Sequence, residues 1–469
     1  MNKSSQSTVA VAGGGLAGLA AACALEDCGF RVSLFERRPY LGGRASSYEH
    51  PGTGEVVDNC QHVLFGCCTN LVEFYRRIGV ADRIRWYDTM TFIEPGGRAS
   101  VLQASPLPAP MHTAPSFLRF PFLTAADKFA IARALAALTL TDQKDTGRSF
   151  QWWLQEHQQT EKAIQRFWKP ILVSALSEDL DLISIAYAAQ VVRVSMMSPG
   201  ARHMGVPMIP LTELYNAAGD YIRSHGGAIQ FRNSIESFSP GGSRVRVRLS
   251  DGEEAFDYLV LALPFDGVDR VLPEIQESRE LREKLAHFEA SPITGIHLWF
   301  DRQISELDHA VLLDRTIQWM FHKSRLLTTN GRGKTGEDNG SYVELVVSSS
   351  KSLIEKSRSE IVDLALLEFR EFFPAAREAN LLKSAVIKEV HATYSPRPGL
   401  DAYRPQAPSV WPRVFLAGDW TATGWPATME GAIRSGYLAA ESLARAAGIK
   451  DAKFLAPDLP PTGLMRLFA

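Results

Sequence analysis

The chain has 469 residues, of which 45% are hydrophobic, 10% aromatic and 22% charged. At roughly 100–200 residues per domain, this length predicts about two to four domain-sized units, and the apolar fraction excludes disorder as the main state. Lys and Arg total 50 against 52 for Asp and Glu, so the formal net charge is −2. Proteins that bind nucleic acid carry a basic excess or stripe that neutralises phosphates, and we therefore exclude nucleic acid as a partner.

All five cysteines lie in the first 68 residues: Cys23, Cys28, Cys60, Cys67 and Cys68. Their spacing is not that of a zinc site, so no metal centre is expected. The adjacent pair Cys67-Cys68 has poor geometry for a structural disulfide, and we expect five free thiols in a reducing cytosol.

The first regular pattern is a short β-rich run at 8–12, followed at once by glycines and by an Ala- and Leu-rich stretch that predicts a helix over 16–28. A second β-rich run covers 30–35 and ends at Glu36. The glycines inside the apolar run and its acidic end distinguish it from a signal peptide. No other segment approaches the roughly 18 apolar residues that a spanning helix needs, so none is expected.

The glycines between strand and helix form the pattern Gly13-x-Gly15-x-x-Gly18, which is typical of a dinucleotide-binding unit. Gly13 permits the tight turn, and Gly15 lets the backbone approach a pyrophosphate at the helix N-terminus. Gly18 allows the helix to pack close to the strand. Glu36 stands where a carboxylate accepts hydrogen bonds from a ribose.

A second glycine pair, Gly42-Gly43, is followed directly by Arg44. Bare backbone and a guanidinium can hold a second face of the pyrophosphate. With the whole run 36–45, this resembles the glycine-doublet flavoproteins: amine oxidases, protoporphyrinogen oxidases and carotenoid desaturases. The resemblance implies FAD as the cofactor, with its isoalloxazine reaching into a second domain.

Near the C-terminus, residues 414–420 predict a strand that ends in Gly418-Asp419, and 429–447 predict a helix. In the resembling flavoproteins, the Asp binds the ribitol or phosphate region. The start of the helix, from Met429 to Ala432, points free N–H groups at the O2 side of the flavin, where they stabilise its reduced form. The resemblance implies further cofactor contacts by Leu16, Ala17, Arg37, Gln61, His62, Ile235 and Pro264.

Further β-rich runs at 227–231, 233–238, 243–249 and 255–263 complete the expected cofactor domain. We expect an α/β (α+β) fold with a Rossmann-like FAD-binding domain assembled from 1–95, 205–290 and 385–450. A mixed α/β substrate domain of 96–204 and 291–384 is interleaved with it, and 451–469 form an irregular tail. Helices are expected at 125–140 and 357–373, and a hairpin loop at 330–340.

Four motifs narrow the resemblance: the Gln61-His62 run at 58–67, Phe167-Trp168-Lys169-Pro170, the turn at 205–211 and Gly424-Trp425-Pro426. They resemble the hydroxysqualene dehydroxylases, the squalene-associated FAD enzymes of hopanoid-producing bacteria, over residues 8–447. Two positions depart from that pattern, with Cys60 in place of a glycine and Lys169 in place of an acid.

That resemblance implies reductive removal of a tertiary or allylic hydroxyl from an apolar C30 isoprenoid, which gives squalene. An allylic C–O bond ionises readily once the leaving hydroxyl is protonated or hydrogen-bonded, and reduced FAD delivers hydride from N5 to the allyl cation. The protein must exclude water, which would recapture the cation.

His62 and Trp425 are the candidate catalytic residues. His62 has a suitable pKa for general acid work, although Gln61-His62 could equally serve only to hydrogen-bond flavin or backbone. Trp425 is expected to line the flavin face, where an aromatic wall stabilises cations, but a core aromatic would look the same in sequence.

Residues 105–123 mix prolines with large apolar side chains, so we expect an irregular surface segment. Two interpretations stay open: a membrane contact where substrate enters, or a loop folded against its own domain. The first places the protein in the cytoplasm, peripherally associated with the inner face of the membrane. The sequence gives no indication of the oligomeric state.

Two other functions fit parts of the pattern. One is a flavin-dependent desaturase or oxidase of a carotenoid-like polyene or a porphyrinogen, which shares the cofactor motifs. The other is a non-catalytic prenyl-lipid carrier, against which both preserved halves of the cofactor site argue.

Overall fold

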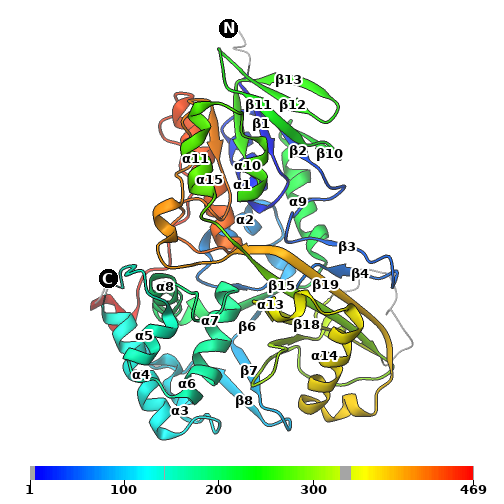
Figure 1. Ribbon diagram of the computed structural model, residues 1–469, viewed down its shortest axis with the longest axis vertical. Coiled ribbons are helices and arrows are strands. Elements are labelled where there is room, and N and C mark those ends of the chain that lie inside the picture. The colour runs from blue at the N-terminus through cyan, green and yellow to red at the C-terminus, as the bar shows by residue number, and fades with distance from the viewer. Residues whose placement is uncertain (1–5, 142, 328–339, 468–469) are drawn as a thin grey trace.

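The computed structural model describes residues 6–141, 143–327 and 340–467, so that most of the loop expected at 330–340 lies outside it. The chain forms two layered halves, one above the other in Figure 1. The upper half is built on a five-stranded sheet and the lower half on a seven-stranded sheet.

The five-stranded sheet is parallel and has the order β10-β2-β1-β14-β20. Its strands are β10 (Ala228–Phe231), β2 (Arg31–Glu36), β1 (Thr8–Ala12), β14 (Tyr258–Leu261) and β20 (Val414–Leu416). In the central strand β1, residues 9–12 are buried, as expected for a parallel strand covered on both faces. Val9 and Val11 pack into one apolar core, and Ala10 and Ala12 pack into another.

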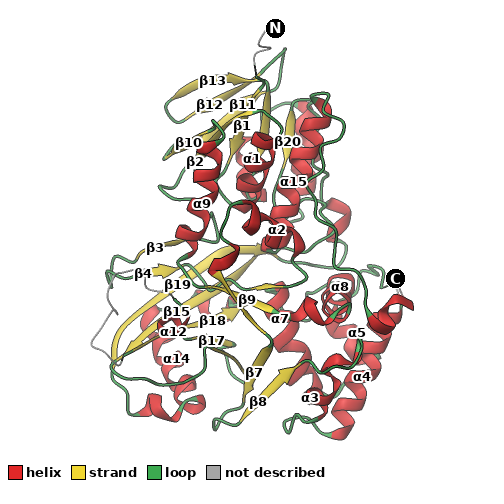
Figure 2. Ribbon diagram, turned by 180° about the vertical axis from the view of Figure 1, so that it is seen from behind, coloured by secondary structure: helices red, strands yellow, loops and turns green. Residues whose placement is uncertain are grey.

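Helices cover the first of these faces, and Figure 2 shows them in front of the sheet. They are α1 (Leu16–Asp27), α2 (Thr69–Arg77), α9 (Leu211–Ser224) and α15 (Met429–Ala446). The opposite face is covered by α10 (Phe265–Val271), α11 (Arg279–Leu285) and the antiparallel strands β11 (Ile235–Ser239), β12 (Val245–Leu249) and β13 (Gly252–Phe256). Helices α1 and α15 touch closely, because a Cβ at Gly436 would lie 2.3 Å from the carbonyl oxygen of Ala17. Helices from the N-terminal and C-terminal parts of the sequence therefore pack against each other in one half.

The seven-stranded sheet has the order β19-β15-β18-β17-β16-β7-β8. Its strands are β7 (Thr89–Ile93), β8 (Ala99–Gln103), β15 (Ala290–Phe300), β16 (His309–Leu312), β17 (Trp319–Phe321), β18 (Ser341–Ser348) and β19 (Leu381–Tyr394). Helix α14 (Arg358–Phe372) packs on one face. A helical layer packs on the other: α3 (Ala114–Leu118), α4 (Ala125–Leu140), α5 (Phe150–Glu156), α6 (Glu161–Ala163), α7 (Lys169–Leu176) and α8 (Ile185–Met196).

Several short elements lie outside these layers. They are β3 (Ser47–Glu49), β4 (Val56–Asp58), β5 (Leu64–Phe65), β6 (Ile84–Tyr87), β9 (Met204–Pro207), α12 (Lys323–Leu326), α13 (Lys351–Ile354) and the 3₁₀ turn η8 (Gly463–Leu467). All five cysteines are free thiols. Within the described ranges, no helix combines the length and hydropathy needed to cross a membrane.

The structure corrects the expectation of an irregular segment at 105–123. Residues 111–113 form a 3₁₀ turn, and helix α3 follows directly. Pro115 stands in the first turn of α3, where a missing N–H costs nothing because no helical acceptor exists there.

Two further expectations differ from the structure. The single run at 255–263 is divided into β13 and β14 by Asp257, whose carboxylate accepts hydrogen bonds from the backbone and hydroxyl of Thr8 at 2.8 and 2.9 Å. Residues 89–93 and 385–394, which we expected in the FAD domain, belong to the seven-stranded sheet as β7 and part of β19. Strand β19 thus runs from one half to the other, and its backbone, not a flexible linker, joins them.

Candidate active site

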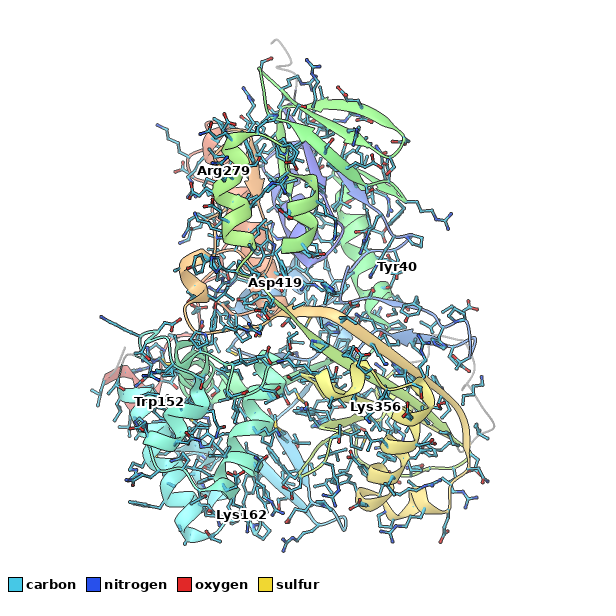
Figure 3. The ribbon with its side chains drawn as sticks, in the orientation of Figure 1. Tyr40, Trp152, Lys162, Arg279, Lys356 and Asp419 are labelled. Atoms are coloured by element: carbon cyan, nitrogen blue, oxygen red, sulfur yellow. The ribbon has the colours of Figure 1, made fainter. Side chains whose placement is uncertain are left out.

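A cavity of about 1250 Å³ lies where the two halves meet, and it is larger than the roughly 300–1,000 Å³ typical of small-molecule sites. Its wall includes the ends of β1, β2, β14 and β20 from the upper half and residues of α4, α7, α8 and β16–β18 from the lower half. Figure 3 places Asp419 at this junction. The volume accommodates a cofactor together with a second large molecule.

The turn between β1 and α1 forms one end of the cavity. Gly13 has φ +104°, and a Cβ there would lie 2.5 Å from the carbonyl oxygen of Ala262, so only glycine fits. Gly15 is the N-cap of α1 without a side-chain cap, and a Cβ there would be 3.9 Å from its nearest neighbour. Gly15, Leu16 and Ala17 line the cavity, so the free N–H groups at the start of the helix face it and can bind a phosphate. Gly18 does not line it; a Cβ there would lie 1.9 Å from the Gly13 carbonyl oxygen.

Glu36 ends β2, and its carboxylate is held in place from two sides. The backbone N–H groups of Gly14 and Arg38 donate to its two oxygens at 2.7 and 2.8 Å. A carboxylate offers about four lone-pair sites, so two remain for ribose hydroxyls. Arg37, the next predicted contact, lies at the cavity but is solvent-exposed.

Gly42, Gly43 and Arg44 line the cavity beside the first turn. Arg44 donates to Asp419 at 2.8 Å and to the carbonyl of Ala392 at 3.0 Å. This ion pair joins two sequence motifs that lie 375 residues apart, and part of the guanidinium fork remains for phosphate. Arg38, which the sequence reasoning did not single out, donates to the Gly43 carbonyl at 2.9 Å and also lines the cavity.

The distal motif lies on the opposite wall. Gly418, Asp419, Met429 and Ala432 all line the cavity. Thr428 caps α15 by accepting from the Gly431 N–H at 3.0 Å, and the first turn of α15 directs its positive end to the same space. Ile235, at the start of β11, and Pro264, the N-cap of α10, also line the cavity.

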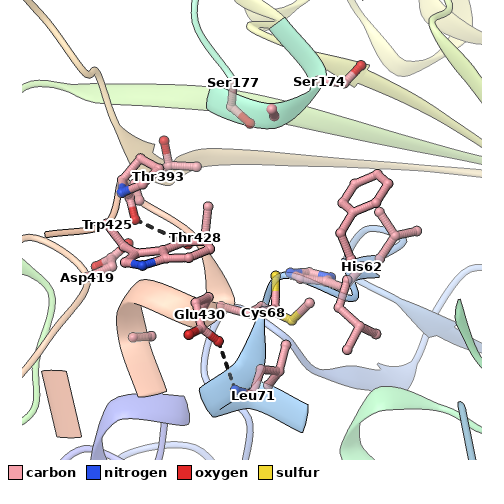
Figure 4. Close-up of a pocket in the computed structure, with 18 of the residues that line it drawn as sticks. His62, Cys68, Leu71, Ser174, Ser177, Thr393, Asp419, Trp425, Thr428 and Glu430 are labelled. Carbon is pink, nitrogen blue, oxygen red and sulfur yellow. Dashed lines mark hydrogen bonds between the residues drawn. The ribbon is translucent and has the colours of Figure 1, made fainter. Parts of the chain in front are cut away.

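The 59–62 turn forms the side of the cavity facing Asp419 and Trp425 (Figure 4). His62 Nδ1 lies 2.7 Å from the Cys60 carbonyl oxygen, so Nδ1 carries the proton. Burial lowers the pKa of His62 below its usual value. A neutral ring with its one N–H already bound to backbone has no proton to give at Nε2, and this geometry does not support His62 as a general acid.

Trp425 is 9% exposed and lines the cavity. The guanidinium of Arg434 lies 4.8 Å from its ring centroid. Arg434 in turn donates to the buried Glu430 at 2.8 Å, and Glu430 accepts from the Leu71 N–H at 2.8 Å (Figure 4). The indole of Trp425 therefore packs against a charged guanidinium and not only against apolar side chains. A second cation near the ring would compete with Arg434 for the same π system.

Beyond the cofactor residues, the cavity continues into a chamber that we call the apolar chamber. Its wall comes from α4, α7, α8, β7, β8 and β16–β18, and none of the described lining residues from these elements is charged. Large side chains dominate it: Phe92, Leu135, Ile171, Val191, Val311, Trp319 and Phe321. No sequence motif signals this set, because its members come from separate elements that only the tertiary fold brings together.

Ser174 is a polar residue of this chamber whose hydroxyl oxygen accepts a hydrogen bond from another chamber side chain. The indole N–H of Trp319 donates to Ser174 Oγ at 2.7 Å, which leaves the serine O–H to donate into the cavity. Ser195 also lines the chamber but donates to the Val192 carbonyl of its own helix at 2.8 Å. Ser174 is thus placed to hold a substrate oxygen.

The C-terminal segment closes part of the wall. Thr462 N–H donates to the Met197 carbonyl at 3.0 Å, and Leu464 N–H donates to the Ala109 carbonyl at 2.9 Å. Between them, a Cβ at Gly463 would lie 2.8 Å from the Ala109 backbone. Met465 is 1% exposed and lines the cavity.

The comparisons with known proteins agree with this geometry. The family model of the flavin-containing amine oxidoreductases matches residues 16–444. The chain belongs to this family. Its cofactor is FAD, which the geometry fits: the two glycine turns and α1 would hold the diphosphate, Glu36 the ribose, and the Asp419 and α15 side the flavin end.

Family members of known sequence include carotenoid desaturases. The chain is 28% identical over 481 residues to the probable zeta-carotene desaturase of Synechococcus elongatus, covering 94% of this chain and 99% of that protein. It is 26% identical over 461 residues to the 15-cis-phytoene desaturase of the same organism, covering 93% and 95%.

Solved structures share the fold at lower identity. Wild-type putrescine oxidase bound to putrescine superposes with a TM-score of 0.70 at 16% identity, covering 95% of this chain and 99% of that one. An oxidoreductase from Methanosarcina mazei gives 0.69 at 15%, covering 92% and 98%. Among the residues that the structure describes, no group of three or more His, Cys, Asp or Glu side chains could hold a metal ion.

Proposed function

We propose that this FAD-dependent oxidoreductase removes the hydroxyl of hydroxysqualene reductively and so forms squalene. The observation that carries the proposal is the uncharged apolar chamber, which is continuous with the cofactor residues in one cavity. A long isoprenoid chain is apolar, so its burial in such a chamber carries no cost of removing water from a charge. A protonated amine buried there would lose its hydration and would lack a counter-charge. The Gln61-His62 and Gly424-Trp425-Pro426 elements favour the dehydroxylase over other members of the family.

When bound and reduced, FAD supplies hydride to the carbon that loses the hydroxyl. The protein's own residues have three tasks. The apolar chamber holds the chain extended and keeps out water that would regenerate the alcohol. Ser174 would donate a hydrogen bond to the substrate hydroxyl, which leaves as water with the second hydrogen of the reduced cofactor supplied as a proton. The rings that line the chamber stabilise the positive charge left on the carbon chain.

The decisive experiment incubates reduced holoenzyme with hydroxysqualene in the absence of oxygen and analyses the products by mass spectrometry. The proposal expects squalene in amounts that follow enzyme concentration, with flavin oxidised in equal amount. Absence of squalene when the protein is folded and contains reduced FAD would overturn the proposal.

A desaturase of carotenoid-like polyenes is the second candidate, and the similarity to the two Synechococcus desaturases favours it. It requires oxidised flavin and an unsaturated product, so a parallel incubation of oxidised holoenzyme with phytoene or zeta-carotene tests it. A prenyl-lipid carrier is distinguished by colour, because a carrier takes up no flavin.

We further propose that the protein acts on the inner face of the membrane and takes its substrate from the bilayer. Several large apolar side chains are exposed on α3, α4 and the segments beside them: Leu107, Met111, Leu118, Phe129, Leu140, Leu464 and Leu467. Met111 and Leu140 also line the cavity, so this surface adjoins the chamber.

Flotation with phospholipid vesicles tests the membrane proposal. The variant L118D/F129D should lose vesicle binding but keep FAD, and unchanged vesicle binding would contradict the proposal.

A further inference from the structure

A buried cluster of charged side chains lies behind the 59–62 turn. Lys323, the first residue of α12, is 2% exposed, and its Nζ lies 2.6 Å from Asp58 Oδ2, 2.7 Å from Gln61 Oε1 and 3.5 Å from Glu344 Oε2. Residues 59–62 line the cavity, whereas Asp58, Lys323 and Glu344 do not. The Lys323 ammonium therefore contacts the 59–62 turn on the side that faces away from the cavity.

Asp58 and Lys323 remain ionised at neutral pH. Burial alone raises the pKa of Asp58, but the Lys323 ammonium and its hydrogen bond lower it below the usual value. Burial alone lowers the pKa of Lys323, but the carboxylates of Asp58 and Glu344 raise it above the usual value. Asp58 is further held by Ser47 Oγ at 2.6 Å and by the Leu211 N–H at 3.2 Å.

Gln61 carries this restraint into the cavity wall. Its amide oxygen accepts from Lys323, and its Nε2 donates to the His62 carbonyl at 3.0 Å. His62 in turn is bonded to the Cys60 carbonyl, and Asn59 Nδ2 donates to the carbonyl of Arg44. The Lys323 ammonium thus restrains the 59–62 turn at Gln61. At Asn59 the same turn is bonded to Arg44, the residue that pairs with Asp419.

We propose that Lys323 is a positioning residue of the flavin site, which acts through Gln61 to hold the 59–62 turn against the cofactor. To neutralise the charge of Asp58, Lys323 would need only its one contact with that carboxylate. A lysine ammonium has three N–H donors, and here one donates to Asp58 and a second to the neutral amide oxygen of Gln61, whereas the carboxyl of Glu344 lies further away at 3.5 Å. The hydrogen bond to Gln61 has no role in charge balance, and Gln61 is the partner that lines the cavity.

The test separates positioning from charge balance. Lys323→Met alone leaves Asp58 buried without its cation and would unfold part of the chain, so the informative variant is D58N/K323M, which removes both charges together. E344Q is the matched control, because it changes the same cluster but leaves the Asp58–Lys323–Gln61 contacts in place. For each purified holoenzyme we would measure the thermal midpoint, the FAD dissociation constant by flavin fluorescence and the visible flavin spectrum.

If Lys323 positions the turn, D58N/K323M retains folding but binds FAD about ten-fold more weakly, the equivalent of one hydrogen bond to a charged group, with a shifted flavin band. E344Q should match the wild type in both. Wild-type FAD affinity and spectrum in D58N/K323M would overturn the proposal and leave Lys323 with charge balance alone.

A second comparison tests the route through Gln61. Q61L should weaken FAD binding to a similar extent, and adding it to D58N/K323M should produce little further loss, because the same interaction is already absent. Independent, multiplying losses would contradict the proposed route. Both comparisons measure the cofactor, so they stand whichever substrate the enzyme takes.

Discussion

At the scale of single residues, Glu344 links the buried cluster to pH. Burial raises its pKa to about 8, with Lys323 opposing the shift, against 4.5 for an ordinary glutamate. The folded chain therefore holds a proton that the unfolded chain releases between these values. This contribution to stability is fully present below pH about 4.5 and is lost as the pH rises through about 8.

We predict that E344Q, which mimics the protonated form, removes this pH dependence. Between pH about 5 and about 8, the free energy of unfolding of the wild type should fall relative to E344Q by up to about 1.4 kcal/mol per pH unit. Urea unfolding of both proteins across that range measures the difference. Parallel curves would show that Glu344 is ionised in the folded protein.

Ser174 yields a second prediction at this scale. S174A removes the hydroxyl that Trp319 orients toward the cavity, and we expect dehydroxylation to slow about ten- to a hundred-fold with FAD content unchanged. S195A is the matched control: the same change in the same chamber, at a hydroxyl already donated to its own helix. Equal effects of the two variants would argue against a role for Ser174.

At the scale of elements, local signals predicted most of the structure. The helix expected at 357–373 is α14, which begins after Ser357, and Ser357 and Glu360 form a reciprocal cap. The helix expected at 125–140 is α4, with an equivalent cap at Thr124. Sequence reasoning was wrong where a local rule had an exception: Pro115 fits the first turn of α3, and Asp257 interrupts an apolar run by bonding to Thr8.

The close packing of the turn between β1 and α1 gives a prediction about the position of helix α1. G18A introduces a Cβ only 1.9 Å from the Gly13 carbonyl oxygen, which forces α1 away from the strand. We expect a loss of about 1–3 kcal/mol in stability and release of FAD on gel filtration. G29A is the control, since Gly29 has φ +80° but open space, and it should cost about 1 kcal/mol and retain FAD.

At the scale of the whole molecule, long-range contacts set the limit of sequence reasoning. The glycine turns, Glu36 and the Asp419 motif are each marked by neighbouring residues, so the cofactor end of the cavity was open to prediction. Lys323 stands 265 residues from Asp58, and nothing in its surroundings marks it as buried. The apolar chamber likewise exists only after the seven-stranded sheet and the helical layer pack around it.

The C-terminal segment gives a prediction for the chamber as a whole. M465W should fill part of the chamber and lower turnover of a long isoprenoid by at least about ten-fold, because the chain can no longer reach its productive position. L467W, at a side chain that is 76% exposed, is the control and should behave as the wild type. The turnover rate of the isoprenoid with each holoenzyme checks both; normal turnover in M465W would place Met465 outside the substrate's path.

The position of that same segment has a practical consequence for protein engineering. Met465 is 1% exposed and forms part of the cavity wall, and the neighbouring Leu464 N–H donates to the Ala109 carbonyl at 2.9 Å. A truncation that removes residues 462–465 would therefore open the cavity although it leaves every cofactor residue in place. Protein for ligand-binding or turnover measurements should keep this segment intact.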